Sequence, residues 1–115
     1  MKKGVKSGEI YILNISDRTG HEYKAKRPYI VIDTNEYISR NSVVCAIPLS
    51  SKICNSAKSD IFIKSDSGNM LRHDSLIKVD QFCSIDIRRL KYLIGKADRL
   101  TLKQIHRTIK LRFTY

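Results

Sequence analysis

The sequence predicts a β-rich α+β fold, in which a small and strongly bent sheet or partly open barrel is followed by one α-helix. Short runs rich in Ile and Val dominate the first three quarters of the chain, and clusters of Gly, Asn, Ser and Asp separate them. A long helical hydrophobic pattern begins after residue 98. At 115 residues the chain is expected to form a single domain, residues 1–115, with one core.

Six runs of residues are expected to form strands. They are 9–16, 29–33, 42–49, 60–64, 75–82 and 92–97. In 60–64 and 77–82 apolar and polar residues alternate, which is typical of a strand with one face in the core and one face exposed. Residues 35–40 are expected to form a helical turn between the second and third strands.

Two prolines are expected to mark strand ends, because proline cannot donate a ladder hydrogen bond. Pro28 would open the second strand, and Pro48 would end the third, so that the chain leaves the sheet at Leu49. Residues 50–52 would then lie on a rim, with Arg27 on the equivalent rim of the second strand. Polar groups at strand ends are a common way to build a site on a rigid scaffold.

The last helix is expected to cover residues 99–113, with Asp98 as its N-cap. At 3.6 residues per turn, one narrow arc of this helix is apolar and the neighbouring arc is basic. The apolar arc holds Leu102, Ile105, Ile109 and Phe113, and the basic arc holds Arg99, Lys103, Arg107 and Lys110. The basic arc is interpreted as a solvated face.

The charge of the chain indicates a polyanionic partner. Lys and Arg number 22 against 11 Asp and Glu, which leaves a formal charge of +11. So large an excess on a small protein favours nucleic acid, an anionic membrane surface or an acidic protein as the partner. A soluble protein that is basic without such a partner is the alternative.

Several classes of protein are not expected. The longest apolar run, residues 43–49, is far shorter than the roughly 20 residues of a spanning helix. The basic start has no apolar segment behind it, so no signal peptide is predicted. Three cysteines without a CxxC pair indicate a reducing compartment and hence the cytoplasm. The three histidines are scattered, so neither a metal site nor a cofactor is predicted.

Five segments in order resemble the MazF/PemK family of toxin endoribonucleases. They are GEIYILNI (8–15), GHEYKAKRPYIVI (20–32), IPLSSKI (47–53), VDQFCSID (79–86) and IGKA (94–97). They are similar to the family's opening strand and to its G-H-E-Q…R-P-V-L-V-I, V-P-I-T-S-K-I, C-D-Q-I-R-T-I-D and I-G-K-L segments. The resemblance runs from residue 8 to roughly residue 111, nearly the whole chain.

The resemblance implies an SH3-like, partly open β-barrel with a C-terminal α-helix that works as a homodimer. It also implies metal-independent, sequence-specific cleavage of single-stranded RNA by attack of a 2′-OH, which leaves a 2′,3′-cyclic phosphate and a 5′-OH. In the family, an antitoxin with an acidic C-terminal segment covers the RNA groove. The charge of +11 suits both RNA and such a segment.

Two residues on the expected rims match catalytic positions of the family. Arg27 matches the Arg of the R-P pair, and its expected role is to stabilise negative charge on phosphate, because a guanidinium keeps its proton at neutral pH. Ser50 stands where the family usually has a catalytic Thr, and its hydroxyl is expected to donate to the phosphate. A strand-end serine that caps its own turn is the alternative for Ser50.

The resemblance implies proton transfer for Asp80, and either proton transfer or contact with an RNA base for His21. Asp80 matches the Asp of C-D-Q, a base in some family members, and His21 matches the His of G-H-E. Because residues 77–82 alternate, Lys78 is expected on the same strand face as Asp80, where it replaces an Arg used by some relatives. A surface salt bridge between Lys78 and Asp80 is the alternative.

The residues expected to bind RNA are Lys24, Lys26, Ser51, Lys52, Lys78 and Gln81. One departure from the family stands close to them: Cys83 replaces the Arg of I-R-T-I-D. If that Arg supports RNA binding or dimer contacts, Lys24, Lys26 or Arg72 is expected to compensate. This change and Ser50 keep open a non-catalytic, basic RNA-binding barrel. A gyrase-inhibiting toxin of the same architecture is a further alternative, but that class uses a C-terminal Trp and this chain has no Trp.

Overall fold

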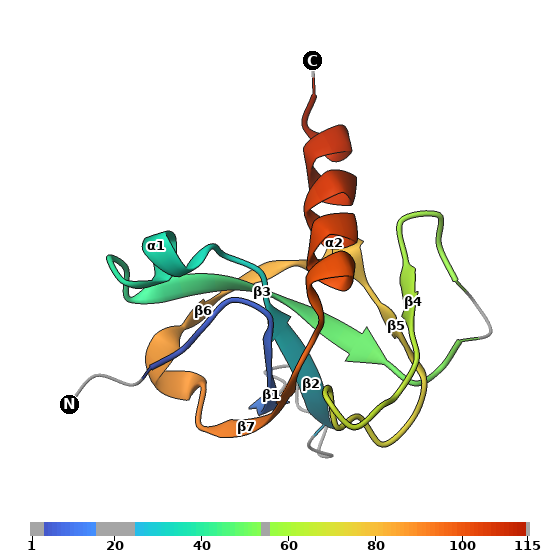
Figure 1. The fold of residues 1–115 in the computed structure, drawn as a ribbon, viewed down its shortest axis with the longest axis horizontal. Helices are drawn as coiled ribbons and strands as arrows, with labels where there is room; N and C mark the ends of the chain where they lie inside the picture. The colour runs from blue at the N-terminus through green and yellow to red at the C-terminus, as the bar shows by residue number, and fades with distance from the viewer. Residues whose placement is uncertain (1–3, 16–24, 54–55, 115) are drawn as a thin grey trace.

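The computed structural model describes residues 4–15, 25–53 and 56–114 (Figure 1). Within these ranges the chain forms seven strands: β1 (Glu9–Ile15), β2 (Ala25–Val31), β3 (Val43–Ser50), β4 (Ile61–Ile63), β5 (Ser75–Ile77), β6 (Cys83–Asp86) and β7 (Tyr92–Lys96). The α-helices are α1 (Asn35–Ile38) and α2 (Arg99–Arg112), and the short 3-10 helices are η1 (Val79–Gln81) and η2 (Ile87–Arg89).

The strands form one curled antiparallel sheet in the order β4-β5-β3-β2-β1-β7, with β6 on β3. Strand β3 is the centre of this arrangement, since β2 pairs along one side of it and two strands, β6 and β5, pair in turn along the other side. Its first half pairs with β6 through Ala46↔Cys83, and its end pairs with β5 through Leu49↔Ile77. Helix α2 stands on the bent sheet (Figure 1). The predicted β-rich α+β class, a partly open barrel with a terminal helix, is therefore confirmed.

The core has two parts because the central strands are buried on both faces. Alternate side chains of a strand point to opposite faces. Ile10, Ile30 and Ile47 belong to a cluster on one face, which is completed by residues of β4, β5 and α2. Tyr11 and Val31, their neighbours along the chain, belong to a cluster on the other face, completed by residues of α1 and β6. Because both faces of these strands are buried, their sequences are apolar along almost their whole length.

Both prolines lie inside strands, which corrects the prediction that they mark strand ends. Pro28 is the fourth residue of β2, and Pro48 pairs with Tyr29 within β3. The carbonyl of Pro48 accepts a hydrogen bond of 3.0 Å from the amide of Lys78. Because N–H and C=O of one strand residue point to the same side, the missing N–H of Pro48 falls where β3 passes from β6 to β5. No ladder bond is lost there, and β3 continues to Ser50.

The run 75–82 is the largest error in the predicted strands. Only Ser75–Ile77 form a strand, and Val79–Gln81 form η1, which buries Val79. The alternation of apolar and polar residues in this run thus comes from a tight turn and not from an extended chain. Lys78 and Asp80 do not share a strand face. The next strand, Cys83–Asp86, was not predicted, because it is short and its first two side chains are exposed.

Helix α2 forms as the capping and the hydrophobic pattern predict. The carboxylate of Asp98 accepts a 2.8 Å hydrogen bond from the amide of Thr101, and Ile105 is fully buried against the sheet. The imidazole Nε2 of His106 lies 2.6 Å from the carbonyl oxygen of Ile32, which ties the helix to the end of β2. The four residues of the basic arc are exposed, as expected for a solvated face. Among the described residues, no helix is long and apolar enough to cross a membrane.

Gly95 in β7 explains why the segment 66–70 packs so closely on the sheet. The amide of Lys96 donates a 3.0 Å hydrogen bond to the carbonyl of Gly68, which draws this segment onto β7. A Cβ atom at Gly95 would overlap the carbonyl group of Asn69 and lie 2.8 Å from the carbonyl oxygen of Gly68. Backbone atoms cannot move aside as a flexible side chain can, so the close approach requires glycine here.

Replacing Gly95 with alanine is expected to lower the free energy of unfolding by about 1–3 kcal/mol, the cost of overpacking. The change would push segment 66–70 away from β7. Gly68→Ala is the matched control, because its nearest neighbour would be the Asp66 carboxylate at an ordinary 3.4 Å. Urea unfolding followed by circular dichroism measures both variants, and equal stabilities of the two would contradict the steric argument.

Candidate active site

The structure brings several of the predicted site residues into one cleft, which we call the Arg27 cleft. It has a volume of about 640 Å³ and lies where β2 begins and β3 ends. Its polar lining consists of Lys26, Arg27, Ser50, Ser51, Lys52, Arg72, His73 and Ser75. Its apolar lining consists of Ile12, Pro28, Leu49, Met70, Leu71 and Ile94. A cleft with an apolar floor and convergent polar groups is typical of a binding or active site.

The pairing of β2 with β3 places Arg27 and Ser50 in this cleft together. Strands β2 and β3 pair as far as Tyr29↔Pro48. Arg27 comes two residues before that pair on β2, and Ser50 comes two residues after it on β3, so both lie just beyond the end of the ladder. Because β3 has already turned toward β5, pairing Ser50 with Leu76, the two strands separate and leave a cleft between them.

The hydroxyl of Ser50 is oriented by its own turn. Its Oγ accepts a 3.2 Å hydrogen bond from the amide of Lys52. This bond uses a lone pair and leaves the hydroxyl proton to be donated to another group. The capping role and the site role, which the sequence analysis treated as alternatives, are therefore compatible in Ser50.

One wall of the cleft is formed by the segment before β5, of which the sequence indicated only Arg72, as a compensating cation. Met70 has a left-handed backbone (φ 57°), uncommon for a residue other than glycine, and it redirects the chain into the cleft. The following residues, Arg72 and His73, line the cleft, and Ser75 Oγ donates a 2.9 Å hydrogen bond to the carbonyl of His73. The signal in the sequence was a charged cluster, RHD, directly before a buried strand.

The charge in the Arg27 cleft has one sign. Lys26, Arg27, Lys52 and Arg72 are cationic, and none of the described residues that line the cleft carries a carboxylate. Cations in a cleft with low-dielectric walls concentrate an anionic ligand there. Guanidinium groups also offer paired donors to phosphate oxygens. The lining is therefore suited to a phosphate-containing ligand.

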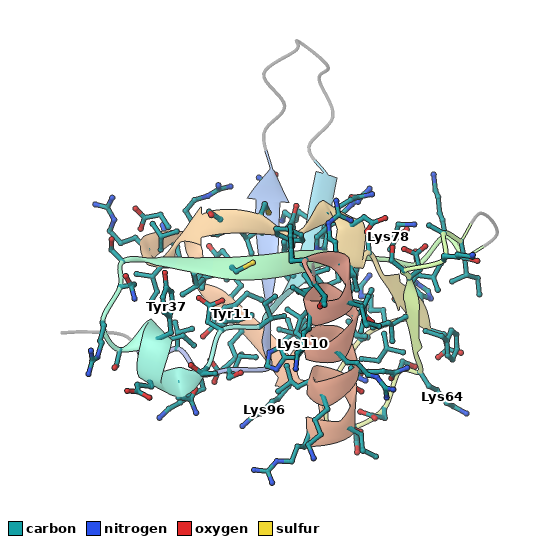
Figure 2. The ribbon with its side chains drawn as sticks, turned by 90° about the horizontal axis from the view of Figure 1, so that it is seen from above. Tyr11, Tyr37, Lys64, Lys78, Lys96 and Lys110 are labelled. Carbon is teal, nitrogen blue, oxygen red and sulfur yellow. The ribbon has the colours of Figure 1, made fainter. Side chains whose placement is uncertain are left out.

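Lys78, predicted to bind RNA, has another partner. Its Nζ lies 2.6 Å from the Asp60 carboxylate in an ion pair whose side chains are only 18% and 2% exposed. The same carboxylate accepts a 2.8 Å hydrogen bond from the amide of Ala57. Lys78 lies beside β4 and β5, across the molecule from Tyr37 of α1 (Figure 2). Lys78 thus forms a buried ion pair that holds residues 57–60 to the end of β5.

Asp80 and Gln81 lie in η1 and do not line the Arg27 cleft. The Asp80 carboxylate lies 2.6 Å from Arg112 near the end of α2, and both side chains are about half exposed. The Arg112 guanidinium also lies over the rings of Phe82 and Phe113, at 5.9 and 5.7 Å from their centroids. The structure therefore joins Asp80 to the terminal helix and not to Arg27 and Ser50.

Two predicted site residues, His21 and Lys24, lie outside the described residues. Cys83, where the family pattern has Arg, is exposed at the start of β6. The residue as a whole is exposed, but partial burial of its thiol raises the thiol pKa, and the charge of Arg89 offsets part of that rise. Arg89 thus supplies a cation near the position of the missing arginine, where Lys24, Lys26 or Arg72 was expected to compensate.

The sequence and the fold are each similar to those of known proteins. The family described as PemK-like, MazF-like toxin of type II toxin-antitoxin system matches residues 6–113. None of the curated protein sequences matches the chain at a significant level. Among solved structures, MazF from Deinococcus radiodurans matches with a TM-score of 0.75 and 19% identity, over 96% of this chain and 97% of that one.

Structures of complexes match over a similar extent. A MazE-MazF structure from Deinococcus radiodurans has a TM-score of 0.75 and 19% identity, over 98% of this chain and all (100%) of that one. An endoribonuclease in complex with its cognate antitoxin, from a mycobacterial species, has a TM-score of 0.71 and 14% identity, over 99% of both chains. These likenesses establish the fold, and the family match covers nearly the whole sequence. This chain belongs to the PemK-like, MazF-like family of toxins of type II toxin–antitoxin systems.

Proposed function

We propose that this toxin is an endoribonuclease that cleaves single-stranded RNA, such as mRNA, at a short sequence motif. The observation that carries the proposal is the Arg27 cleft, in which a guanidinium and an oriented hydroxyl stand among cations. The family match supports the same activity. The 2′-OH attacks the adjacent phosphorus, the bond from phosphorus to the 5′-oxygen breaks, and the products carry a 2′,3′-cyclic phosphate and a 5′-OH.

This reaction needs stabilisation of the negative charge that develops on the phosphorane oxygens. Arg27 provides it, because its planar donors match two phosphate oxygens and keep their protons at neutral pH. Ser50 donates its free hydroxyl proton to one of the same two non-bridging oxygens. Preorganised donors of this kind are among the largest contributions to catalysis. The cations of the cleft supply the positive charge that stabilises the developing negative charge, and we assign no role to a metal ion.

The reaction also needs a base for the 2′-OH proton and an acid for the leaving 5′-oxygen. His73 lies in the Arg27 cleft and imidazole takes up and releases protons readily near neutral pH, so we assign proton transfer to His73. It takes the role that the family resemblance gave to Asp80, which is joined to Arg112. His21 is the second residue proposed for proton transfer, on the family resemblance.

The same cationic surface suits a protein partner. The MazE-MazF structure and the mycobacterial endoribonuclease with its cognate antitoxin are relatives of similar fold. We propose that a cognate antitoxin covers the Arg27 cleft of this chain with an acidic segment, and that the toxin acts as a homodimer in the cytoplasm. The charge of +11 favours attraction of both RNA and an acidic segment.

The experiment is incubation of the purified protein with a long, mixed-sequence RNA in EDTA, followed by mapping of the fragment ends. We expect cuts at one short motif, with 5′-OH and 2′,3′-cyclic phosphate ends. Intact RNA in the presence of folded protein would contradict the proposal and favour the RNA-binding barrel without catalysis. Inhibition of DNA supercoiling by gyrase, measured in parallel, would instead indicate the gyrase-inhibiting class.

A further inference from the structure

A second basic cleft adjoins the Arg27 cleft. It has a volume of about 940 Å³ and lies beside β1, β7 and η2, and we call it the Tyr92 cleft. Its lining includes Lys26, Arg88, Arg89, Lys91 and Tyr92. Apart from Lys26, none of these residues was predicted to belong to the site, and the chemistry proposed above does not use them.

The two clefts meet at the β1–β2 pair, where they share lining residues. Ile12 and Lys26 line both of them. In β1, Ile12 pairs with Pro28 on one side, in the Arg27 cleft, and with Tyr92 on the other side, in the second cleft. Burial raises the pKa of the Tyr29 hydroxyl, and the charges of Arg27 and Arg89 each offset part of that rise, which agrees with one cation from each cleft near this side chain. An extended ligand can therefore pass from one cleft to the other over Lys26.

Most of the positive charge in the Tyr92 cleft is not neutralised. The Asp86 carboxylate takes up one cation by accepting two hydrogen bonds from the Arg88 side chain, of 3.0 and 2.8 Å. Arg89 and Lys91 are exposed and form no ion pair with a residue that the structure describes. Two cations next to each other in a cleft are suited to successive phosphates of a nucleic-acid strand.

An aromatic side chain stands beside these cations. Tyr92 is 68% exposed, although it lies in a strand whose neighbour β1 is largely buried. A planar ring next to cations is the arrangement that binds single-stranded nucleic acid without sequence preference, because bases stack on the ring while cations follow the backbone. An acidic peptide needs the cations but gains little from the ring, so the combination favours RNA.

We infer that the Tyr92 cleft holds the RNA strand beyond the scissile phosphate, with Arg89 and Lys91 on its backbone and a base stacked on Tyr92. The inference rests on the proposed function, since it takes the Arg27 cleft as the place where RNA is cut. In this arrangement the Tyr92 cleft sets affinity and the length of RNA that is bound, and the Arg27 cleft sets the rate of the chemical step.

The test uses a fluorescein-labelled 12-nucleotide RNA of mixed sequence with 2′-O-methyl groups, which cannot be cut by 2′-OH attack. Binding is measured by fluorescence anisotropy at several salt concentrations. The salt dependence is the slope of the logarithm of the binding constant against the logarithm of the salt concentration. Arg89→Gln/Lys91→Gln is expected to reduce the magnitude of this slope by about 1.4, since each phosphate contact on a single strand contributes roughly 0.7. Tyr92→Ala is expected to weaken binding about 5- to 150-fold, the usual loss of one stacked base, whereas Tyr92→Phe keeps the ring and the affinity.

Lys103→Gln/Arg107→Gln is the matched control, because it removes two exposed charges from the solvated face of α2. An equal change of slope in the control and in the Arg89/Lys91 variant would overturn the inference, because it would show that binding depends on net charge and not on the Tyr92 cleft. Unchanged RNA binding with lost binding of poly-glutamate would also overturn it, in favour of an acidic protein. If the wild type binds this RNA through Arg89 and Lys91 yet cuts no natural RNA, the proposed nuclease activity is contradicted, whereas RNA binding by the Tyr92 cleft is supported.

Discussion

Replacement of Arg27 by alanine is expected to abolish detectable RNA cleavage while the fold remains intact. Loss of one preorganised donor at a transition state slows a reaction by about 10²–10³-fold, and Arg27 would supply paired, charged donors. The side chain is exposed and forms no ion pair with a described residue, so its removal should leave the free energy of unfolding nearly unchanged. Single-turnover cleavage rates at saturating protein give the loss in the chemical step.

Two further variants make this prediction sharper. Arg27→Lys keeps the charge but loses the planar fork, so its rate should fall between those of the wild type and the alanine variant. Arg40→Ala is the matched control, because Arg40 is an exposed arginine in a weak pair with Glu36, outside the Arg27 cleft. A folded Arg27→Ala protein that cuts at the wild-type rate would remove Arg27 from the mechanism.

Replacement of Lys78 by alanine is expected to lower the free energy of unfolding by about 3–5 kcal/mol. The change would leave the Asp60 carboxylate, whose side chain is 2% exposed, with only the Ala57 amide as a described partner. An unpaired buried charge is much more costly than the net gain from an intact pair. In a domain of this size the melting temperature should fall on the order of 15 °C. Urea and thermal unfolding measure both quantities.

The control for this prediction is Lys64→Ala, which removes an exposed lysine directly after β4 and should cost little. The double variant Lys78→Met/Asp60→Leu should recover most of the lost stability, because it removes both charges and fills the same space with apolar atoms. Loss of RNA affinity in Lys78→Ala with unchanged stability would contradict the internal ion pair and restore Lys78 as an RNA contact.

Elements with a local signal could be predicted from the sequence. Strand β1 and helix α2 lie within a residue or two of their predicted bounds, since alternation, helical periodicity and the Asp98 cap act over neighbouring residues. The run after Ser75 could not be predicted in the same way. There an alternating pattern is produced by η1, and only the pairing of β3 with both β5 and β6 decides where the chain turns.

The candidate site shows the same division. Arg27, Ser50 and Lys52 could be proposed as site residues from the sequence, because the family motifs indicated them, although Arg27 lies inside β2 and not at its start. His73 could not be, because it enters the cleft from a connection whose path depends on Met70 and on the close approach of Gly95 to the segment 66–70. Asp80 was placed at the site on family resemblance, and its contact with Arg112 of α2 gives it a different neighbour.

The sequence by itself determined the fold class, the position of most strands and the terminal helix, and the strong positive charge, since each follows from composition or from short-range patterns. Only the tertiary structure decided which side chains share a cleft and which cations are neutralised. Lys78 and Arg89 are both basic residues near the end of a strand, yet one is buried against Asp60 and the other is exposed in the Tyr92 cleft. That difference depends on partners far apart in the chain, which local patterns do not encode.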